Sequence, residues 1–107
     1  MTRYVRRRYI AVKIEGNLTL SERDLYDAAW ASLAKLFGEY GASQAELSLI
    51  EYSPEKKQAV FRCSHKALEM VKASLAAMTE VANEKVAFHI IRVSGTLRAL
   101  RTKTANK

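Results

Sequence analysis

The sequence predicts a single α+β domain in which strands and helices follow one another in the order β-α-β-β-α-β. Four short segments alternate apolar and polar residues, or are strongly apolar, as strands do, and two longer segments carry apolar residues at helical spacing. A chain of 107 residues with 49% hydrophobic content is enough for one ordinary core. This order of elements is typical of the ferredoxin-like arrangement.

The first half predicts one strand and one long helix. Residues 9–15 alternate, with Ile10, Val12 and Ile14 on one side, and Gly16-Asn17 ends this strand. Ser21 has the character of a helix cap, and acidic residues follow it in the first turn. Gly38 and Gly41 are expected to stop the helix. Its apolar face consists of Leu25, Ala29, Leu33 and Leu36, widened by Tyr26, Trp30 and Phe37.

The second half predicts a hairpin, a second helix and a fourth strand. Residues 46–53 and 58–63 form the hairpin, joined by a turn at 54–57 in which proline fixes φ. The second helix begins near Ser64, which is expected to cap it, and runs to about Thr79. The very apolar residues 86–93 form the fourth strand, and residues 97–101 form a short C-terminal helix.

Right-handed crossovers fix the sheet topology. With the predicted strands numbered along the chain, the antiparallel sheet has the order 4-1-3-2, and both helices cover one face. This order places the start of the first strand beside the ends of the third and fourth. Three basic segments that are far apart in the sequence are therefore expected to converge on one rim.

The formal net charge of +7 resides in the two ends of the chain. Residues 1–8 and 98–107 hold several Arg and Lys and no acidic residue, whereas the body between them is balanced. We expect residues 1–8 and 102–107 to be flexible basic tails on a single domain that spans 1–107. Such ends favour a polyanionic partner, with RNA or DNA as the default, although terminal cations can also serve only solubility.

The densest polar run is Arg62-Cys63-Ser64-His65-Lys66. Cys63 alternates with Ala59 and Phe61 on a strand, so we expect a core thiol rather than a nucleophile. The basic members of the run are candidate phosphate contacts, together with cations from both ends of the chain. The predicted RNA-binding residues are Arg6, Arg7, Arg8, Arg62, His65, Lys66, Arg98 and Arg101.

Other chemistry finds little support in the sequence. There is no metal-ligand spacing, no paired-carboxylate motif and no glycine-rich phosphate loop, and His89 is interpreted as a structural or sheet-surface residue. We therefore expect no catalytic residue and no metal site. The third strand lacks the aromatic signature of RNA-recognition modules, and Tyr9 is the only candidate stacking residue on the sheet. A single cysteine, no secretory signal and no membrane-spanning run favour a cytoplasmic protein.

Several stretches together resemble one known family. They occur in order over about residues 6–101, and the pair Arg-Cys-Ser-His-Lys and the later Val-Ser-Gly-Thr is the most specific part. The pattern is similar to archaeal ribonuclease P protein component 2, the relative of the eukaryotic Pop-five subunit. The stretches are Arg7-Arg8-Tyr9-Ile10-Ala11, Ala29-Trp30-Ala31-Ser32-Leu33, Leu36-Phe37-Gly38-Glu39-Tyr40-Gly41-Ala42-Ser43, Leu49-Ile50-Glu51-Tyr52, Arg62-Cys63-Ser64-His65-Lys66 and Arg92-Val93-Ser94-Gly95-Thr96-Leu97.

The resemblance implies a role inside ribonuclease P, which removes the 5′ leader from precursor tRNA. The RNA subunit is then the catalyst and carries the Mg²⁺, while the protein binds no cofactor and supplies no catalytic residue. The implied partners are ribonuclease P RNA, ribonuclease P protein component 3 and, through the complex, precursor tRNA. Two such protein pairs can join into a heterotetramer through a homodimer contact.

Two other functions remain compatible with the residues. Charge alone permits a ribosomal or other RNA-binding accessory protein. A basic rim beside a helix N-terminus also permits a small phosphate-ester or acyl-phosphate hydrolase on the same fold, although the first strand-helix turn, Gly16-Asn17-Leu18, offers little of the anion loop that such an enzyme needs.

Overall fold

The protein is described by a computed structural model, which covers residues 6–16 and 20–100. A turn of helix at 97–100 closes the described chain. The predicted fourth strand, residues 86–93, lies within β5 (Glu84–Ser94). The elements are β1 (Arg7–Gly16), α1 (Glu22–Ala45), β2 (Ser48–Ser53), β3 (Gln58–Ser64), the 3₁₀ helix η1 (His65–Ala67), α2 (Leu68–Ala77), β4 (Glu80–Val81) and β5 (Glu84–Ser94).

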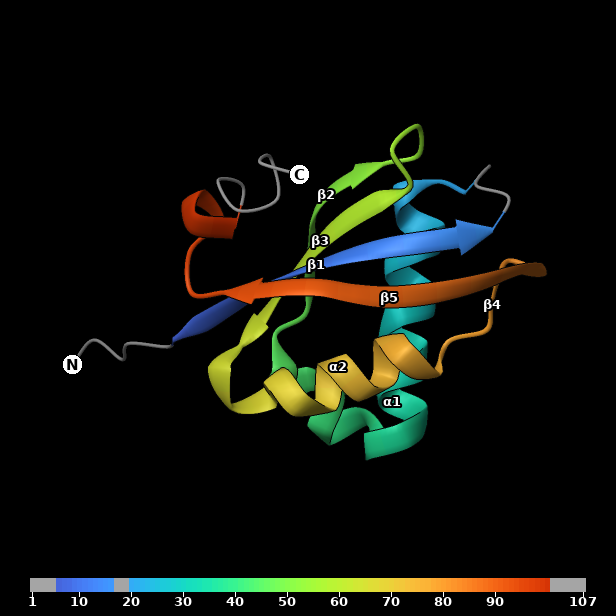
Figure 1. Ribbon diagram of the computed structural model, residues 1–107. Helices are drawn as coiled ribbons and strands as arrows, with labels where there is room; N and C mark the ends of the chain where they lie inside the picture. Colours follow the sequence, from blue (N-terminus) through green and yellow to red (C-terminus); the bar gives the residue numbers. More distant parts are fainter. Residues whose placement is uncertain (1–5, 17–19, 101–107) are drawn as a thin grey trace.

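The sheet is antiparallel and has the order β2-β3-β1-β5-β4. Its four main strands confirm the predicted order, and α1 and α2 lie together on one side of it (Figure 1). The edge strand β4 was not predicted. It forms a hairpin with β5 through Ala82 and Asn83, whose φ values of 50° and 69° both lie in the left-handed region, as in a type I′ turn.

The core lies between the sheet and the two helices. The predicted inward face of β1 is confirmed, since Ile10, Val12 and Ile14 are fully buried. Ile10 lies opposite Phe61 of β3 in the antiparallel register, so both side chains point toward the helices. The helices supply the rest of the core, chiefly Leu25, Ala29, Leu33, Val71 and Leu75.

Helix α1 begins as predicted but does not stop at the two glycines. The Ser21 hydroxyl accepts a hydrogen bond from the N–H of Asp24, and the Asp24 carboxylate accepts one from the N–H of Ser21, which makes a capping box. Gly38 adopts a positive φ of 82°, which glycine tolerates because it has no Cβ. The helix resumes beyond this kink. Ala42 and Ala45 are buried, so core packing holds the second segment in place.

The connection from β3 to α2 also differs from expectation. Ser64 does not cap the helix, because its hydroxyl donates a 3.3 Å hydrogen bond to the carbonyl oxygen of Gln44. A 3₁₀ turn follows, and α2 ends at Ala77 because Met78 is extended. Arg7 and Arg8, which were predicted to lie in the N-terminal tail, belong to β1, whereas 102–107 lie outside the described residues.

Candidate nucleic-acid interface

The start of β1 and the end of β3 lie side by side. Arg7 is opposite Ser64 in the antiparallel register, and the N–H of His65 donates a 2.7 Å hydrogen bond to the carbonyl oxygen of Arg6. Sheet pairing therefore joins the N-terminal arginines to the segment 62–66, as the strand order predicts.

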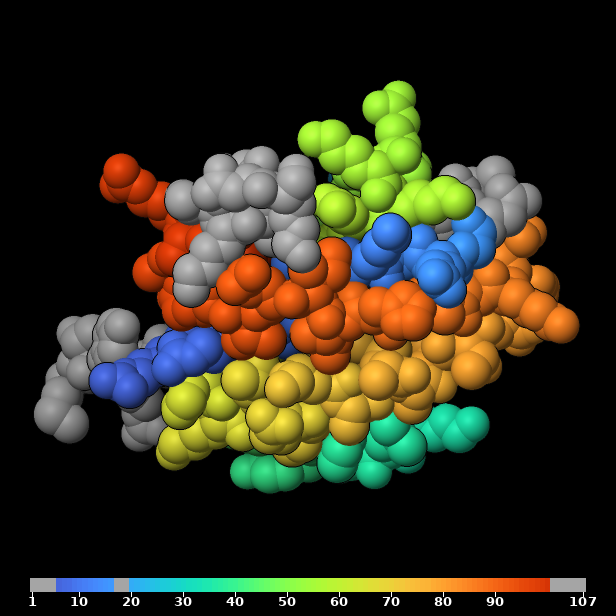
Figure 2. Space-filling model, in the orientation of Figure 1, coloured from blue at the N-terminus to red at the C-terminus, as the bar shows by residue number. Residues whose placement is uncertain are grey.

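The end of β5 completes this cluster of basic segments. Tyr9 lies opposite Ser94, and a Cβ placed on Gly95 would be 3.5 Å from Nη1 of Arg8. Figure 2 shows the blue start of β1 between the orange-red end of β5 and the yellow-green connection that follows β3. Arg98 is exposed on the following helical turn, and the predicted site residue Arg101 lies outside the described residues. We call this cluster the basic end; its described residues are Arg6, Arg7, Arg8, Arg62, His65, Lys66 and Arg98.

The side chains of the basic end divide between two surfaces. Phe61 and Cys63 are fully buried beneath the helices, so Arg62 between them points to the opposite, outer face of the sheet. His65 and Lys66, by contrast, are exposed and border a groove on the helical side. The predicted single rim is therefore two adjoining basic surfaces, because alternation along β3 turns Arg62 away from its neighbours.

The outer face holds a second arginine that the sequence analysis missed. Arg92 lies opposite Ala11 on β1, while Arg62 lies opposite Tyr9, so two guanidinium groups flank the Tyr9 position. The Nε atoms of both arginines are buried and have no hydrogen-bond partner among the described residues. A buried donor without an acceptor is costly, and two of them on one face suit an anionic ligand.

A β-bulge explains why Arg92 was missed. Simple alternation from the inward-facing Phe88 and Ile90 puts Arg92 on the core side. The register between β1 and β5 shifts between Ala11 and Val12, and this shift turns Arg92 to the outer face. The run Ile90-Ile91-Arg92 contains no glycine or proline that signals a bulge.

The groove on the helical side has a volume of about 610 Å³. Its walls come from the start of β1, the second segment of α1 and the connection from β3 to α2. Cations line it at Arg6 and Lys66, and Tyr40, with 79% of its surface exposed, stands at its edge. The acidic lining residue Glu46 is paired with Arg7 at 3.4 Å. The groove thus combines positive charge with an aromatic ring.

Cys63 lies inside the core, as predicted. Burial raises the pKa of its thiol to about 11, and the charge of Arg8 offsets only part of this shift. The thiol is therefore neutral at physiological pH and cannot act as a nucleophile. The second histidine, His89, lies outside the basic end. It is exposed on the sheet, and its Nε2 atom is 3.3 Å from Oε1 of Glu15.

The described residues form neither a metal-binding cluster nor a membrane-spanning helix. In 6–16 and 20–100, no group of three or more His, Cys, Asp or Glu side chains is arranged to hold a metal ion. Within the same residues, no helix is both long and apolar enough to span a membrane.

The chain is similar to known proteins over most of its length. The family model described as Rpp14/Pop5 matches residues 8–105. Ribonuclease P protein component 2 of Methanosarcina mazei is 26% identical over 98 residues, which span 92% of this chain and 83% of that protein. The protein of the same name from Thermococcus kodakarensis is 27% identical over 96 residues, covering 90% and 80% of the two chains.

A solved structure shares the fold. A chain of the cryo-EM structure of yeast Ribonuclease MRP superposes with a TM-score of 0.68 at 14% sequence identity, covering 99% of this chain and 93% of that one. At this identity the likeness establishes the architecture of strands and helices.

Proposed function

The chain belongs to the Rpp14/Pop5 family, and from this premise we propose that it is an RNA-binding protein subunit of ribonuclease P. In this role it supports the catalytic RNA while the 5′ leader is removed from precursor tRNA. The RNA binds the Mg²⁺ and performs the cleavage, and the protein contributes neither a catalytic residue nor a cofactor.

The observation that carries the proposal is the convergence of three basic segments at the basic end. The hydrogen bond between His65 and Arg6 holds two of them together, and Arg8 beside Gly95 brings in the third. Arginine pairs with phosphate in a bidentate geometry, and neutralised phosphates can approach one another in folded RNA. The basic end therefore supports RNA folding by screening charge, which lowers the Mg²⁺ concentration that the RNA requires.

The proposed assembly also includes proteins. We expect contacts with ribonuclease P protein component 3 and with a second copy of this chain, and access to precursor tRNA through the complex in the cytoplasm. Leu36 and Phe37 beside the α1 kink support a protein contact, because 49% and 40% of their surfaces are exposed. Large apolar side chains that lie together on a surface are typical of interaction sites.

Reconstitution tests the proposal. Precursor-tRNA cleavage is measured with ribonuclease P RNA and protein component 3, with and without this chain. We expect the chain to restore cleavage at low Mg²⁺, and identical cleavage curves in both mixtures would contradict the proposal. RNA captured by the tagged chain distinguishes this function from the alternative. Enrichment of ribosomal RNA in place of ribonuclease P RNA would indicate a ribosomal accessory protein.

A further inference from the structure

We propose that the groove on the helical side of the basic end binds one unpaired nucleotide of RNA. Its base stacks on Tyr40, and its flanking phosphates contact Arg6 and Lys66. This inference rests on the proposed RNA-binding function and adds to it a single-stranded specificity that phosphate screening does not supply.

The walls of the groove are fixed relative to one another. The Ser64 hydroxyl bonds the carbonyl oxygen of Gln44 at 3.3 Å, which ties the second segment of α1 to the end of β3. The His65 N–H bonds the carbonyl oxygen of Arg6 at 2.7 Å, which ties the same turn to β1. The volume of about 610 Å³ lies within the range of roughly 300–1,000 Å³ that ligand sites occupy. A preformed groove of this size can receive a nucleotide without reorganising the fold.

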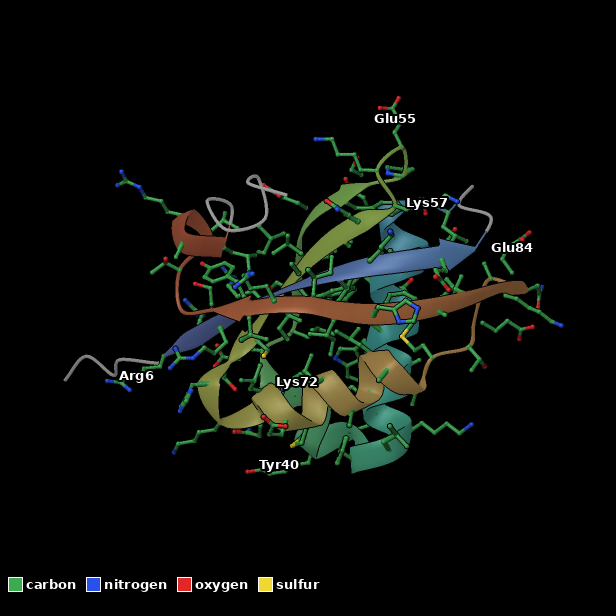
Figure 3. All side chains as sticks on the ribbon, in the orientation of Figure 1. Arg6, Tyr40, Glu55, Lys57, Lys72 and Glu84 are labelled. Carbon is green, nitrogen blue, oxygen red and sulfur yellow. The ribbon has the colours of Figure 1, made fainter. Side chains whose placement is uncertain are left out.

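Tyr40 supplies the stacking surface. It follows the kink at Gly38 and belongs to the second segment of α1, and it lies below α2 in the view of Figure 3. With 79% of its surface exposed, its ring is not used by the core. Every base presents a flat face to an aromatic ring, so such contacts tolerate any sequence. Base stacking on Tyr40 covers an apolar ring that otherwise faces water.

Part of the groove lining is apolar. Met70 and Ala67 of the α2 region and Gly41 of α1 contribute to it. A Cβ added at Gly41 would lie 3.3 Å from Cβ of Phe37 and 3.4 Å from Cε of Met70. The polarisable sulfur of Met70 can make a favourable contact with an aromatic base in the groove. The side-chain amide of Gln44 can both donate to and accept from a base edge.

The charges around the groove favour a phosphate-bearing ligand. Arg6 and Lys66 border it, and Glu46, the acidic residue among the described lining residues, is already paired with Arg7 at 3.4 Å. A cationic border around an aromatic ring is the combination by which proteins hold single-stranded RNA. Duplex RNA cannot enter in the same way, because its bases are stacked on one another.

The test compares single-stranded with duplex RNA on the full chain. The probes are a short unstructured RNA that carries one 2-aminopurine and the same strand annealed to its complement. We expect Tyr40→Ala to raise the Kd for the single strand roughly 5- to 100-fold and to leave the duplex Kd within about twofold. Tyr40→Phe keeps the ring and retains affinity. Ser43→Ala is the control, since it removes an exposed side chain of the same helical segment that does not line the groove.

A second readout locates the base directly. The NMR signal of the Met70 methyl group is expected to shift when the single strand binds and to stay in place with the duplex, because a stacked base adds a ring current beside it. Thermal unfolding of each variant confirms that the fold is retained.

The outcomes separate this inference from the proposed function. If Tyr40→Ala binds both RNAs like the wild type, with the same salt dependence, the nucleotide groove is refuted and the RNA-binding function stands. If the wild type binds neither RNA, both are refuted. Loss of self-association in Tyr40→Ala without loss of single-strand affinity overturns the inference in favour of a second copy of the chain in the groove.

Discussion

The backbone N–H of His65 donates a 2.7 Å hydrogen bond to the carbonyl oxygen of Arg6, across 59 positions of sequence. This bond extends the pairing of β1 with β3 by one residue beyond Arg7 and Ser64. The backbones of Arg6 and His65 are therefore held together at the edge of the sheet, and Lys66 follows in the 3₁₀ turn η1. Sites on strands hold their geometry more firmly than sites on loops, which suits a surface that must match phosphate positions.

Removal of two cations from this site should weaken RNA binding uniformly. We expect Arg6→Ala/Lys66→Ala to lower the log–log slope of affinity against salt by about 0.7–0.9 for each phosphate that the protein no longer neutralises. Filter binding or fluorescence anisotropy over a salt series measures the slope. The control is Lys56→Ala/Lys85→Ala, which removes the same charge elsewhere: Lys56 precedes Lys57 in the β2–β3 turn and Lys85 follows Glu84 at the start of β5, and both labelled neighbours lie far from Arg6 in Figure 3. Equal slopes for the two double variants would show that the basic end has no special role.

The arginines of the outer face should act as a pair. Because the Nε atoms of Arg62 and Arg92 have no hydrogen-bond partner in residues 6–16 and 20–100, we expect Arg92→Ala to weaken RNA binding about as much as Arg62→Ala and to leave the free energy of unfolding nearly unchanged. Lys13→Ala is the control on the same face of the sheet, farther along β1. A large loss of stability with unchanged RNA affinity would instead make Arg92 a structural residue.

The fold was largely predictable because its signals are local. Alternation in β1, the capping box at Ser21 and the turn after Pro54 each depend on a few neighbouring residues, and right-handed crossovers then leave one strand order. The kink at Gly38 was not predictable in this way. A helix can end at a glycine or continue beyond it. Here the helix continues because Ala42 and Ala45 are buried in the core, where they pack against distant parts of the chain.

The site was predictable as a set of segments but not as a surface. Strand order predicts that Arg6–Arg8 and 62–66 meet, and the structure brings them together. The face on which each side chain lies depends on details that the sequence hides. The bulge in the β1–β5 pairing redirects Arg92, and the resumed helix carries Tyr40 to the groove.

The buried thiol should make stability fall at alkaline pH. The pKa of Cys63 is about 11 in the folded protein, against an ordinary value of 9.0, so the unfolded chain loses its proton first as pH rises. The neutral buried thiol contributes roughly 2–3 kcal/mol to the free energy of unfolding below pH 9. This contribution is lost as the pH rises from about 9 to 11. The free energy of unfolding in urea is measured over this pH range for the wild type and for Cys63→Ala. The difference between the two pH profiles gives the contribution of the thiol. Parallel profiles would contradict the assignment.

The capping box should contribute measurably to α1. Ser21→Ala removes the acceptor of the 3.1 Å bond from the Asp24 N–H and leaves that donor without its partner. We expect the free energy of unfolding to fall by about 1 kcal/mol in urea denaturation. Ser43→Ala, an exposed serine in the last turns of the same helix, serves as the control and should change stability by no more than about 0.5 kcal/mol.

The most direct test of the central claim is the Mg²⁺ dependence of precursor-tRNA cleavage in the reconstituted particle. Ribonuclease P RNA and protein component 3 are combined with the wild type, with Arg6→Ala/Lys66→Ala or with the control Lys56→Ala/Lys85→Ala. We expect the basic-end variant alone to shift the half-maximal Mg²⁺ concentration upward, while cleavage at saturating Mg²⁺ recovers. Coincident Mg²⁺ curves for all three proteins would contradict the claim that the basic end supports the catalytic RNA.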